Sequence, residues 1–176
     1  MEIRDATAAD AAGIAEIYND AVLTTTASFD IEPKSPEDRM KWLLARSPAH
    51  PVLIAEIDGA IAGWGALSPY SERPAYAATA ELSVYVAAPH RSQGVGRALT
   101  CALVERGRRA ALHVLLARIC TENEASIAMV RSLGFTDAGT MHQVGWKFER
   151  WLDVATWEYD LDTPRVDTSC SGDTLT

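Results

Sequence analysis

One stretch, residues 81–99, constrains the fold of this chain more than any other. It begins with an apolar, β-branched run at residues 82–86, breaks at Pro89, and contains Gly94 and Gly96 just before an apolar helical pattern begins. A strand, a glycine-rich turn and a helix N-terminus in this order predict an anion-binding site. The first amide groups of a helix have no intrahelical partner, and the helix dipole adds partial positive charge there. Both glycines let the backbone approach a ligand because they lack a Cβ atom.

Other glycine-rich turns are alternatives for this stretch. A Rossmann fingerprint is excluded because Leu99 stands where the third glycine would be. A Walker A loop is excluded because no Gly-Lys-Ser/Thr follows the glycines. A plain strand-to-helix turn that happens to hold two glycines stays open. The local charge favours the anion site, because residues 90–109 contain five arginines and one acid in a chain of net charge -8.

The composition limits the class of protein. With 176 residues, 48% hydrophobic and 23% charged, the chain suits one globular domain. The sequence pI near 4.9 argues against a nucleic-acid-binding protein. No apolar run approaches the roughly 18 residues of a membrane span, and the N-terminus does not resemble a signal peptide. A cytoplasmic protein without membrane association is therefore expected. The histidines and cysteines show no metal-binding spacing, so no metal site is expected.

Strand and helix patterns alternate along the chain and predict a mixed α/β sheet. Helices are expected after Thr7, after Ser35, after the glycine turn and after Thr121, because capping residues or a proline mark each start. Strands are expected at 2–5, 52–57, 61–67, 82–86, 114–120, 135–142 and 146–161, with a turn between the last two near Gly145. One domain is expected over 1–162, followed by a polar, disordered tail at 163–176.

Residues 91–96 resemble the pyrophosphate loop of the GNAT acetyltransferase superfamily, whose pattern is Gln/Arg-x-x-Gly-x-Gly/Ala. The order of elements over residues 1 to about 161 is also similar to the GNAT fold. The resemblance implies an enzyme that uses acetyl-CoA, with the loop amides on the pyrophosphate and the preceding strand on the pantetheine arm. The coenzyme contacts implied are Val84, Tyr85, Val86, Arg91, Ser92, Gln93, Gly94, Val95, Gly96, Arg97 and Asn123.

Three separated segments, 17–22, 76–86 and 143–153, are similar to a narrower group within that superfamily. This group contains the phosphinothricin N-acetyltransferases and the methionine sulfone/sulfoximine acetyltransferases. The resemblance implies acetyl transfer to the α-amine of a small L-amino acid or analogue by direct attack of the amine. It also implies a homodimer, with the late hairpin near the subunit interface.

Glu81 is the candidate general base. It stands at the head of an apolar strand beside the glycine turn, and a carboxylate partly buried among apolar neighbours accepts a proton more readily than one in water. In the family that the chain resembles, the glutamate that corresponds to Glu81 has this role. The alternative is a polar residue at a strand edge without a role in chemistry.

Further residues are candidates for binding the acceptor amine. Arg73, Tyr76 and Phe29 match positions of the family's substrate site, and an arginine fork suits carboxylate or phosphinate oxygens. Leu82 and Ser83 follow Glu81, and Ser83 shares its strand face by period two. Arg73 could instead be a solvated loop arginine, and Phe29 could only anchor its loop.

Two positions depart from the family pattern or have a second explanation. Asn123 matches a coenzyme-binding asparagine, but it is also a good N-cap before Glu124. Val130 stands where the herbicide-resistance enzymes of the family carry a histidine, and helix 124–133 has no tyrosine to act as a general acid. Phosphinothricin as the natural substrate is therefore in question.

Two rival functions stay open at this point. One is a GNAT enzyme for another amine, such as a polyamine, an aminoglycoside or a protein N-terminus, which the net charge of -8 permits for cationic acceptors. The other is an acyl-CoA-binding sensor without turnover, which the presence of Glu81 disfavours.

Overall fold

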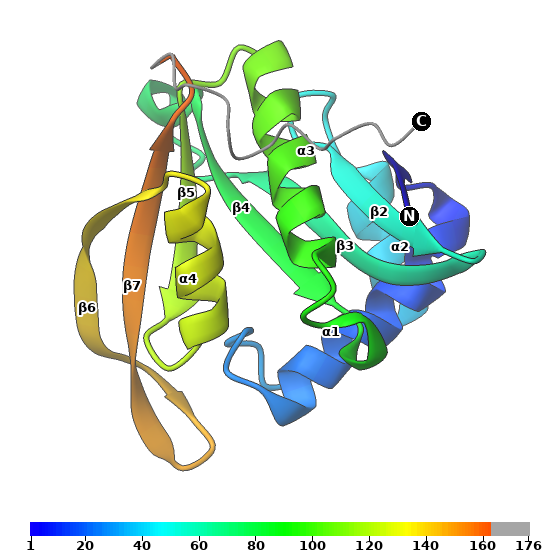
Figure 1. Ribbon diagram of the computed structural model, residues 1–176, viewed down its shortest axis with the longest axis horizontal. Helices are drawn as coiled ribbons and strands as arrows, with labels where there is room; N and C mark the ends of the chain where they lie inside the picture. Colours follow the sequence, from blue (N-terminus) through cyan, green and yellow to red (C-terminus); the bar gives the residue numbers. More distant parts are fainter. Residues whose placement is uncertain (163–176) are drawn as a thin grey trace.

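A seven-stranded sheet organises residues 1–162, the part of the chain that this computed structural model describes (Figure 1). The strand order is β1-β2-β3-β4-β5-β7-β6, and β4 and β5 form the parallel pair in an otherwise antiparallel sheet. The strands are β1 (Glu2–Asp5), β2 (Val52–Ile57), β3 (Ala60–Pro69), β4 (Thr79–Val86), β5 (Val114–Cys120), β6 (Thr136–Lys147) and β7 (Arg150–Asp160). The predicted mixed α/β fold is confirmed. The expected tail at 163–176 lies outside the described residues.

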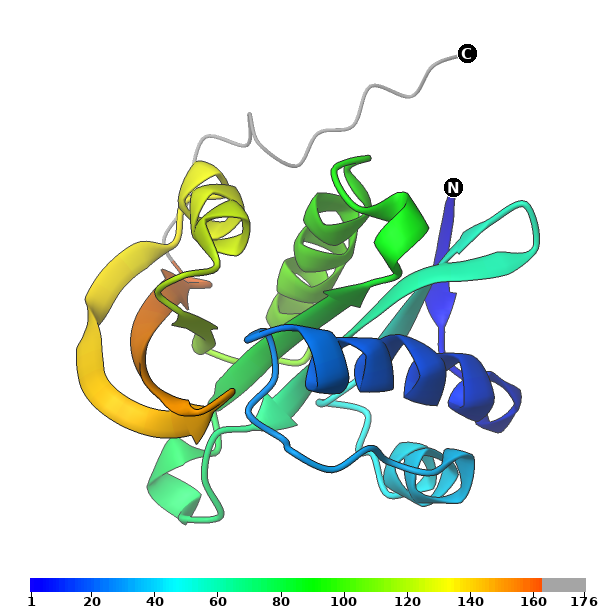
Figure 2. The ribbon, with the colours of Figure 1, turned by 90° about the horizontal axis from the view of Figure 1, so that it is seen from below.

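Helices cover both faces of the sheet. Figure 2 shows α1 and α2 on one side of the strands and α3 and α4 on the other. The helices are α1 (Ala11–Thr24), α2 (Pro36–Leu44), α3 (Val95–Arg109) and α4 (Glu124–Ser132), and the short 3-10 turns are η1 (Ala8–Asp10), η2 (Pro74–Tyr76) and η3 (Ala88–His90). Because helices pack on both faces of the sheet, each face must have its own apolar core.

Side chains that alternate along β2 supply both cores. Val52 and Ile54 pack with α1 and with Trp64 of β3, whereas Leu53 and Ala55 pack with α3. This period of two follows from strand geometry. A strand buried on both faces therefore appears in the sequence as a continuous apolar run.

Local capping fixes where the first helices begin. Ser35 caps α2, since its hydroxyl accepts the amide of Asp38 at 3.1 Å, and Pro36 occupies the first turn. The carboxylate of Asp10 accepts the amide of Thr7 at 2.7 Å, and η1 leads directly into α1. Both predicted helix starts are confirmed.

The position of the closing turn was predicted wrongly. The hairpin turns at Phe148 and Glu149, both with positive φ, and Lys147 pairs with Arg150. Gly145 instead lies within β6, and a Cβ atom there would come 2.8 Å from the ring of Phe29. The glycine at this position makes room for an aromatic side chain, which a sequence pattern does not distinguish from a turn.

Asp10 anchors the N-terminal strand to α1 and gives a test of the fold. Its carboxylate pairs with the Arg4 guanidinium at 2.7 Å, which lowers the pKa of Asp10 from 3.8 to about 2, against the opposing effect of burial. A lowered folded pKa stabilises the fold above pH 3.8, and this stabilisation is lost as pH falls through about 2. We expect Asp10→Asn to lower the free energy of unfolding by about 2 kcal/mol at pH 7, measured by urea denaturation.

The same titration series provides the control. The difference between Asp10→Asn and the wild type should shrink steadily below pH 4, and Asp38→Asn at the exposed cap of α2 should cost less at pH 7. An Asp10→Asn difference that stays constant down to pH 2 would contradict the assignment.

Candidate active site

The two parallel strands separate part-way along their length, and this opening defines the candidate site. Pairing covers three positions, Thr79 with Val114, Ala80 with Leu115 and Glu81 with Leu116. Beyond these positions β4 continues to Val86 along β3 only, and β5 continues to Cys120 along β7 only. Figure 1 shows the two strands diverging. The backbone of the far half of β4 therefore faces an opening where a neighbouring strand would lie.

A cleft of about 630 Å³ lies in this opening. It is lined from β4 and β5, from α4, from the segment that follows α1, and from the β6–β7 hairpin. The lining residues are Tyr18, Thr26, Ala27, Ser28, Phe29, Asp30, Glu81, Leu82, Ser83, Val84, Tyr85, Ala117, Arg118, Ile119, Cys120, Asn123, Ser126, Met129, Val130, Met141, Val144 and Val154. Seven predicted site residues are among them: Phe29, Glu81, Leu82, Ser83, Val84, Tyr85 and Asn123.

The predicted anion-binding loop connects β4 to α3. Gly94 is the N-cap of α3 in the left-handed region, with φ +83°, and Ser92 also has a positive φ of 62°. Among the described residues, no protein group accepts the backbone amides from Ser92 to Gly96. A Cβ atom at Gly96 would meet Met129 Sδ at 3.4 Å, an ordinary contact. Packing within the protein therefore does not explain this second glycine, whereas close approach of a ligand would.

Three side chains of the loop, those of Arg91, Gln93 and Arg97, donate to protein partners. Arg91 donates to Asp20 of α1 at 2.8 Å, and Gln93 donates to the Pro89 carbonyl at 2.8 Å. Arg97 donates to the Ser132 hydroxyl of α4 at 3.0 Å. These contacts hold the loop in shape and leave its backbone amides and the exposed Ser92 side chain to bind a ligand.

Glu81 lies where the strands separate. Its side chain is 23% exposed, and its Oε2 accepts a hydrogen bond from the Arg118 guanidinium of β5 at 2.6 Å. The sequence predicted apolar surroundings for this carboxylate and missed Arg118. The available signal was that Arg118 is the one charged residue in the otherwise apolar run 114–120.

A polar network shapes the segment after α1. The Tyr18 hydroxyl donates to Asp30 at 2.8 Å and accepts from Ser28 at 2.9 Å. Burial raises the pKa of Tyr18 and that of Tyr85. Both phenols therefore stay protonated at neutral pH, and the Tyr18 hydroxyl keeps the proton that it donates to Asp30.

A buried lysine joins the same segment to the late hairpin. Lys147 is 5% exposed, and its ammonium donates to the carbonyl oxygens of Thr25 at 2.9 Å and Ser28 at 2.5 Å. Desolvation lowers the pKa of Lys147. Together with the contact of Phe29 on Gly145, these bonds make one wall of the cleft out of two distant parts of the chain.

The remaining predicted residues are placed as follows. Asn123 caps α4, because its Oδ1 accepts the Ser126 amide at 3.2 Å, which leaves its NH₂ group for another acceptor. Val130 is 1% exposed and belongs to the apolar core. Arg73 and Tyr76 lie in the segment between β3 and β4 and do not line the cleft, and Tyr76 packs on Tyr70 at 5.3 Å between ring centroids.

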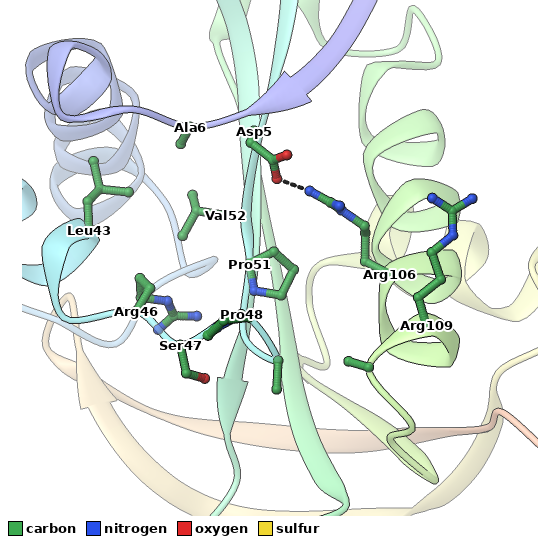
Figure 3. A pocket seen from close by; sticks show the side chains of 12 residues that line it. Asp5, Ala6, Leu43, Arg46, Ser47, Pro48, Pro51, Val52, Arg106 and Arg109 are labelled. Atoms are coloured by element: carbon green, nitrogen blue, oxygen red, sulfur yellow. Dashed lines mark hydrogen bonds and ion pairs between the residues drawn. The ribbon is translucent and has the colours of Figure 1, made fainter.

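A second cavity, of about 690 Å³, lies at the opposite end of α3 from the glycine loop (Figure 3). Its arginines are engaged within the protein. Arg106 pairs with Asp5, Arg109 pairs with Glu105 at 2.9 Å, and Arg46 donates to backbone carbonyls including that of His50 at 2.9 Å. We therefore take the cleft between β4 and β5 as the candidate active site.

Two further features bear on the expectations about metals and membranes. His113, Asp160 and Asp162 lie within 4.8 Å of one another at the other end of β5 from the cleft, a grouping that sequence spacing did not reveal. Two of them already bond to each other, since His113 Nδ1 is 2.6 Å from Asp162. In the described part of the chain, every helix is too short or too polar to span a bilayer.

Comparison with known proteins identifies the family. A family model described as the acetyltransferase (GNAT) domain matches residues 3–156. The chain belongs to the GNAT family of acetyltransferases. The family expected from the glycine loop and Glu81 is confirmed, and the chain is an N-acetyltransferase by its relatives.

Three relatives illustrate the range of the match. The L-methionine sulfoximine/L-methionine sulfone acetyltransferase of Salmonella typhimurium is 39% identical over 97% of this chain and 100% of its own length. A phosphinothricin acetyltransferase from Sinorhizobium meliloti, solved in complex with acetyl-CoA, is 33% identical with TM-score 0.87 over 99% of this chain and 97% of that one. A ribosomal-protein-alanine N-acetyltransferase from Brucella melitensis is 42% identical, with TM-score 0.89 over 91% of this chain and 99% of that one.

Proposed function

We propose that this protein transfers the acetyl group of acetyl-CoA to the α-amine of small L-amino acids or analogues such as methionine sulfone, methionine sulfoximine and phosphinothricin. The observation that carries the proposal is the opening between β4 and β5, with Glu81 at its start and uncapped loop amides at its end. Relatives at 39% and 34% identity are named for these substrates.

The residues around the opening fit the coenzyme. The amides from Ser92 to Gly96 would hold the pyrophosphate at the N-terminus of α3, where the helix dipole favours negative charge. The free edge of β4 at Val84–Val86 would bond the amides of the pantetheine arm, and the Asn123 NH₂ group would donate to it. Bound acetyl-CoA supplies an activated thioester carbonyl.

Glu81 is the group we propose for proton removal. The acceptor arrives as an ammonium ion, and its nitrogen becomes nucleophilic only after it loses a proton. The Glu81 carboxylate takes that proton, directly or through one water molecule. The freed nitrogen then forms a bond to the thioester carbon and the carbon–sulfur bond breaks. The thiolate leaves, and the proton that the nitrogen loses on becoming an amide passes to the thiolate or to water. A thiolate whose thiol pKa is near 8.5 needs little help from an acid, in keeping with a helix α4 without tyrosine.

A protein N-terminus is the second candidate acceptor. The Brucella relative is named for a ribosomal protein's alanine, and it is as similar to this chain as the amino-acid enzymes are. The cleft favours the smaller acceptor because it is walled in. One wall consists of the segment from Thr26 to Asp30 and the hairpin residues Met141 and Val144, which leaves less room for a peptide than for a free amino acid.

We also propose that two copies associate through the β6–β7 hairpin, as the family resemblance implies. Trp146, Phe148 and Trp151 are 52%, 46% and 58% exposed, and such clustered aromatic surface is typical of interfaces. A cytoplasmic location stays a prediction.

A thiol-release assay tests the proposed activity. With acetyl-CoA and a panel of acceptors, we expect turnover with L-methionine sulfone and L-methionine sulfoximine, and much slower turnover with spermidine, kanamycin and a peptide bearing an N-terminal alanine. Turnover of the peptide alone would favour the second candidate. Absence of turnover with every amine, in a protein that binds CoA, would support a coenzyme-binding sensor instead.

Replacing Glu81 tests its role as the base. We expect Glu81→Gln to lower kcat by on the order of 10²-fold while the dissociation constant for CoA is unchanged. The substitution keeps the side chain's size and removes its basicity. An unchanged kcat would remove Glu81 from the mechanism.

Replacing Gly94 tests the loop, and Gly59 provides a matched control. Both glycines have φ near 80° (+83° and +78°), and a Cβ atom at either would meet nothing within 4 Å. Each change to alanine should therefore cost about 1–2 kcal/mol of stability through backbone strain alone. Only Gly94→Ala should also raise KM for acetyl-CoA, by about 10-fold, because it displaces charge-assisted amide contacts. Equal KM values in the two variants would show that the loop does not bind the coenzyme.

A further inference from the structure

We propose that Arg118 binds the carboxylate of the amino-acid acceptor, so that Arg118 and Glu81 together recognise an α-amino acid. The inference rests on the proposed function and deepens it, because it names the residue that selects an acceptor with a free carboxylate. Family resemblance pointed to Arg73 for this task, and Arg73 does not line the cleft.

The charges of the cleft support this assignment. Among the described residues that line it, Arg118 is the only cationic side chain. The acidic members are Glu81 and Asp30, and Asp30 is already bonded to the Tyr18 hydroxyl at 2.8 Å and to Lys34 at 3.1 Å. Among the described lining residues, the Arg118 guanidinium is therefore the one cation that can pair with an anionic group in the cleft.

The hydrogen bonds of Arg118 leave most of its donors open. A guanidinium carries five N–H donors, and in the described part of the chain Arg118 has one protein partner, Glu81, at 2.6 Å. Its side chain is 49% exposed. Arg46, by contrast, donates to the carbonyls of His50 and Leu67 and to the Ser68 hydroxyl. Arg118 is thus placed to bind something other than protein.

The pair of residues also matches the chemistry of the substrate. An α-amino acid carries its ammonium and its carboxylate on the same carbon atom. Glu81 and Arg118 present a carboxylate and a guanidinium side by side at the point where β4 and β5 separate. Opposite charges in this arrangement complement the zwitterion, and the arginine fork suits a carboxylate in a bidentate contact.

A purely structural role of Arg118 in its ion pair with Glu81 would contribute little to stability. Exposed ion pairs contribute about 0–1 kcal/mol to stability, and Arg118 is half exposed. We therefore expect Arg118→Met to fold, with a melting temperature close to that of the wild type.

The test compares an acid with its neutral analogue. L-Methionine sulfone and its carboxamide differ at the carboxylate alone. We expect Arg118→Met to lower kcat/KM for the acid by about 10–100-fold, the range for losing a hydrogen bond to a charged group, mainly through KM. Turnover of the carboxamide should change by less than about 3-fold. Arg118→Lys should restore part of the loss, since it returns the charge without the fork.

The control variant is Arg109→Met, which removes an exposed arginine paired with Glu105 outside the cleft and should leave the turnover of both substrates unchanged. Comparing each substrate across variants cancels the intrinsic difference in reactivity between acid and amide. An equal loss on both substrates would overturn the inference, because Arg118 would then act only through Glu81. No loss on either would also overturn it.

Failure of the proposed function gives a different result. If the wild type acetylates no amine, binding of L-methionine sulfone to the CoA-saturated protein, measured by calorimetry, still decides the role of Arg118. Binding that Arg118→Met abolishes and Arg109→Met preserves supports the inference. Binding that is absent in the wild type, or equal in all three proteins, overturns it.

Discussion

The pairing between β4 and β5 ends after three residue positions, and the site depends on this limited pairing. Backbone amides and carbonyls inside a protein need partners, and a strand that loses its neighbour must find another. Here β4 keeps β3 on one side and faces a cleft on the other. A ligand with its own amide groups can supply the missing partner. The same divergence brings Glu81 to the start of the opening and the N-terminus of α3 to its end.

One wall of the cleft is made by parts of the chain that are distant in sequence. The segment after α1 is held to the late hairpin by the buried Lys147 ammonium and by the Phe29 ring on Gly145. Tyr18 and Asp30 fix the same segment from the α1 side. This wall is therefore set by tertiary contacts. The side chains of Tyr18, Ser28 and Asp30 are already bonded to one another, whereas Arg118 uses one protein partner among the described residues, Glu81, and keeps further N–H donors for a ligand.

Local signals made the fold and the position of the glycine loop between β4 and α3 predictable. Capping residues marked the starts of α1 and α2, and the apolar run before Gly94 placed β4, Glu81 and the loop in order. The contacts that Glu81 and Phe29 make in the cleft were harder to predict. Arg118 meets Glu81 only through the parallel register of two strands 37 residues apart, and Gly145 serves a contact with Phe29 that no local pattern encodes. A lone charge in the apolar run of β5 was the one available clue.

Hydrogen exchange with two ligands tests the central claim most directly. If the opening binds the pantetheine arm and the loop binds the pyrophosphate, saturating CoA should slow amide exchange both at Val84–Val86 and at Gly94–Gly96. Pantetheine, which lacks the pyrophosphate, should slow exchange at the strand alone. Exchange in the loop that CoA leaves unchanged would contradict the account.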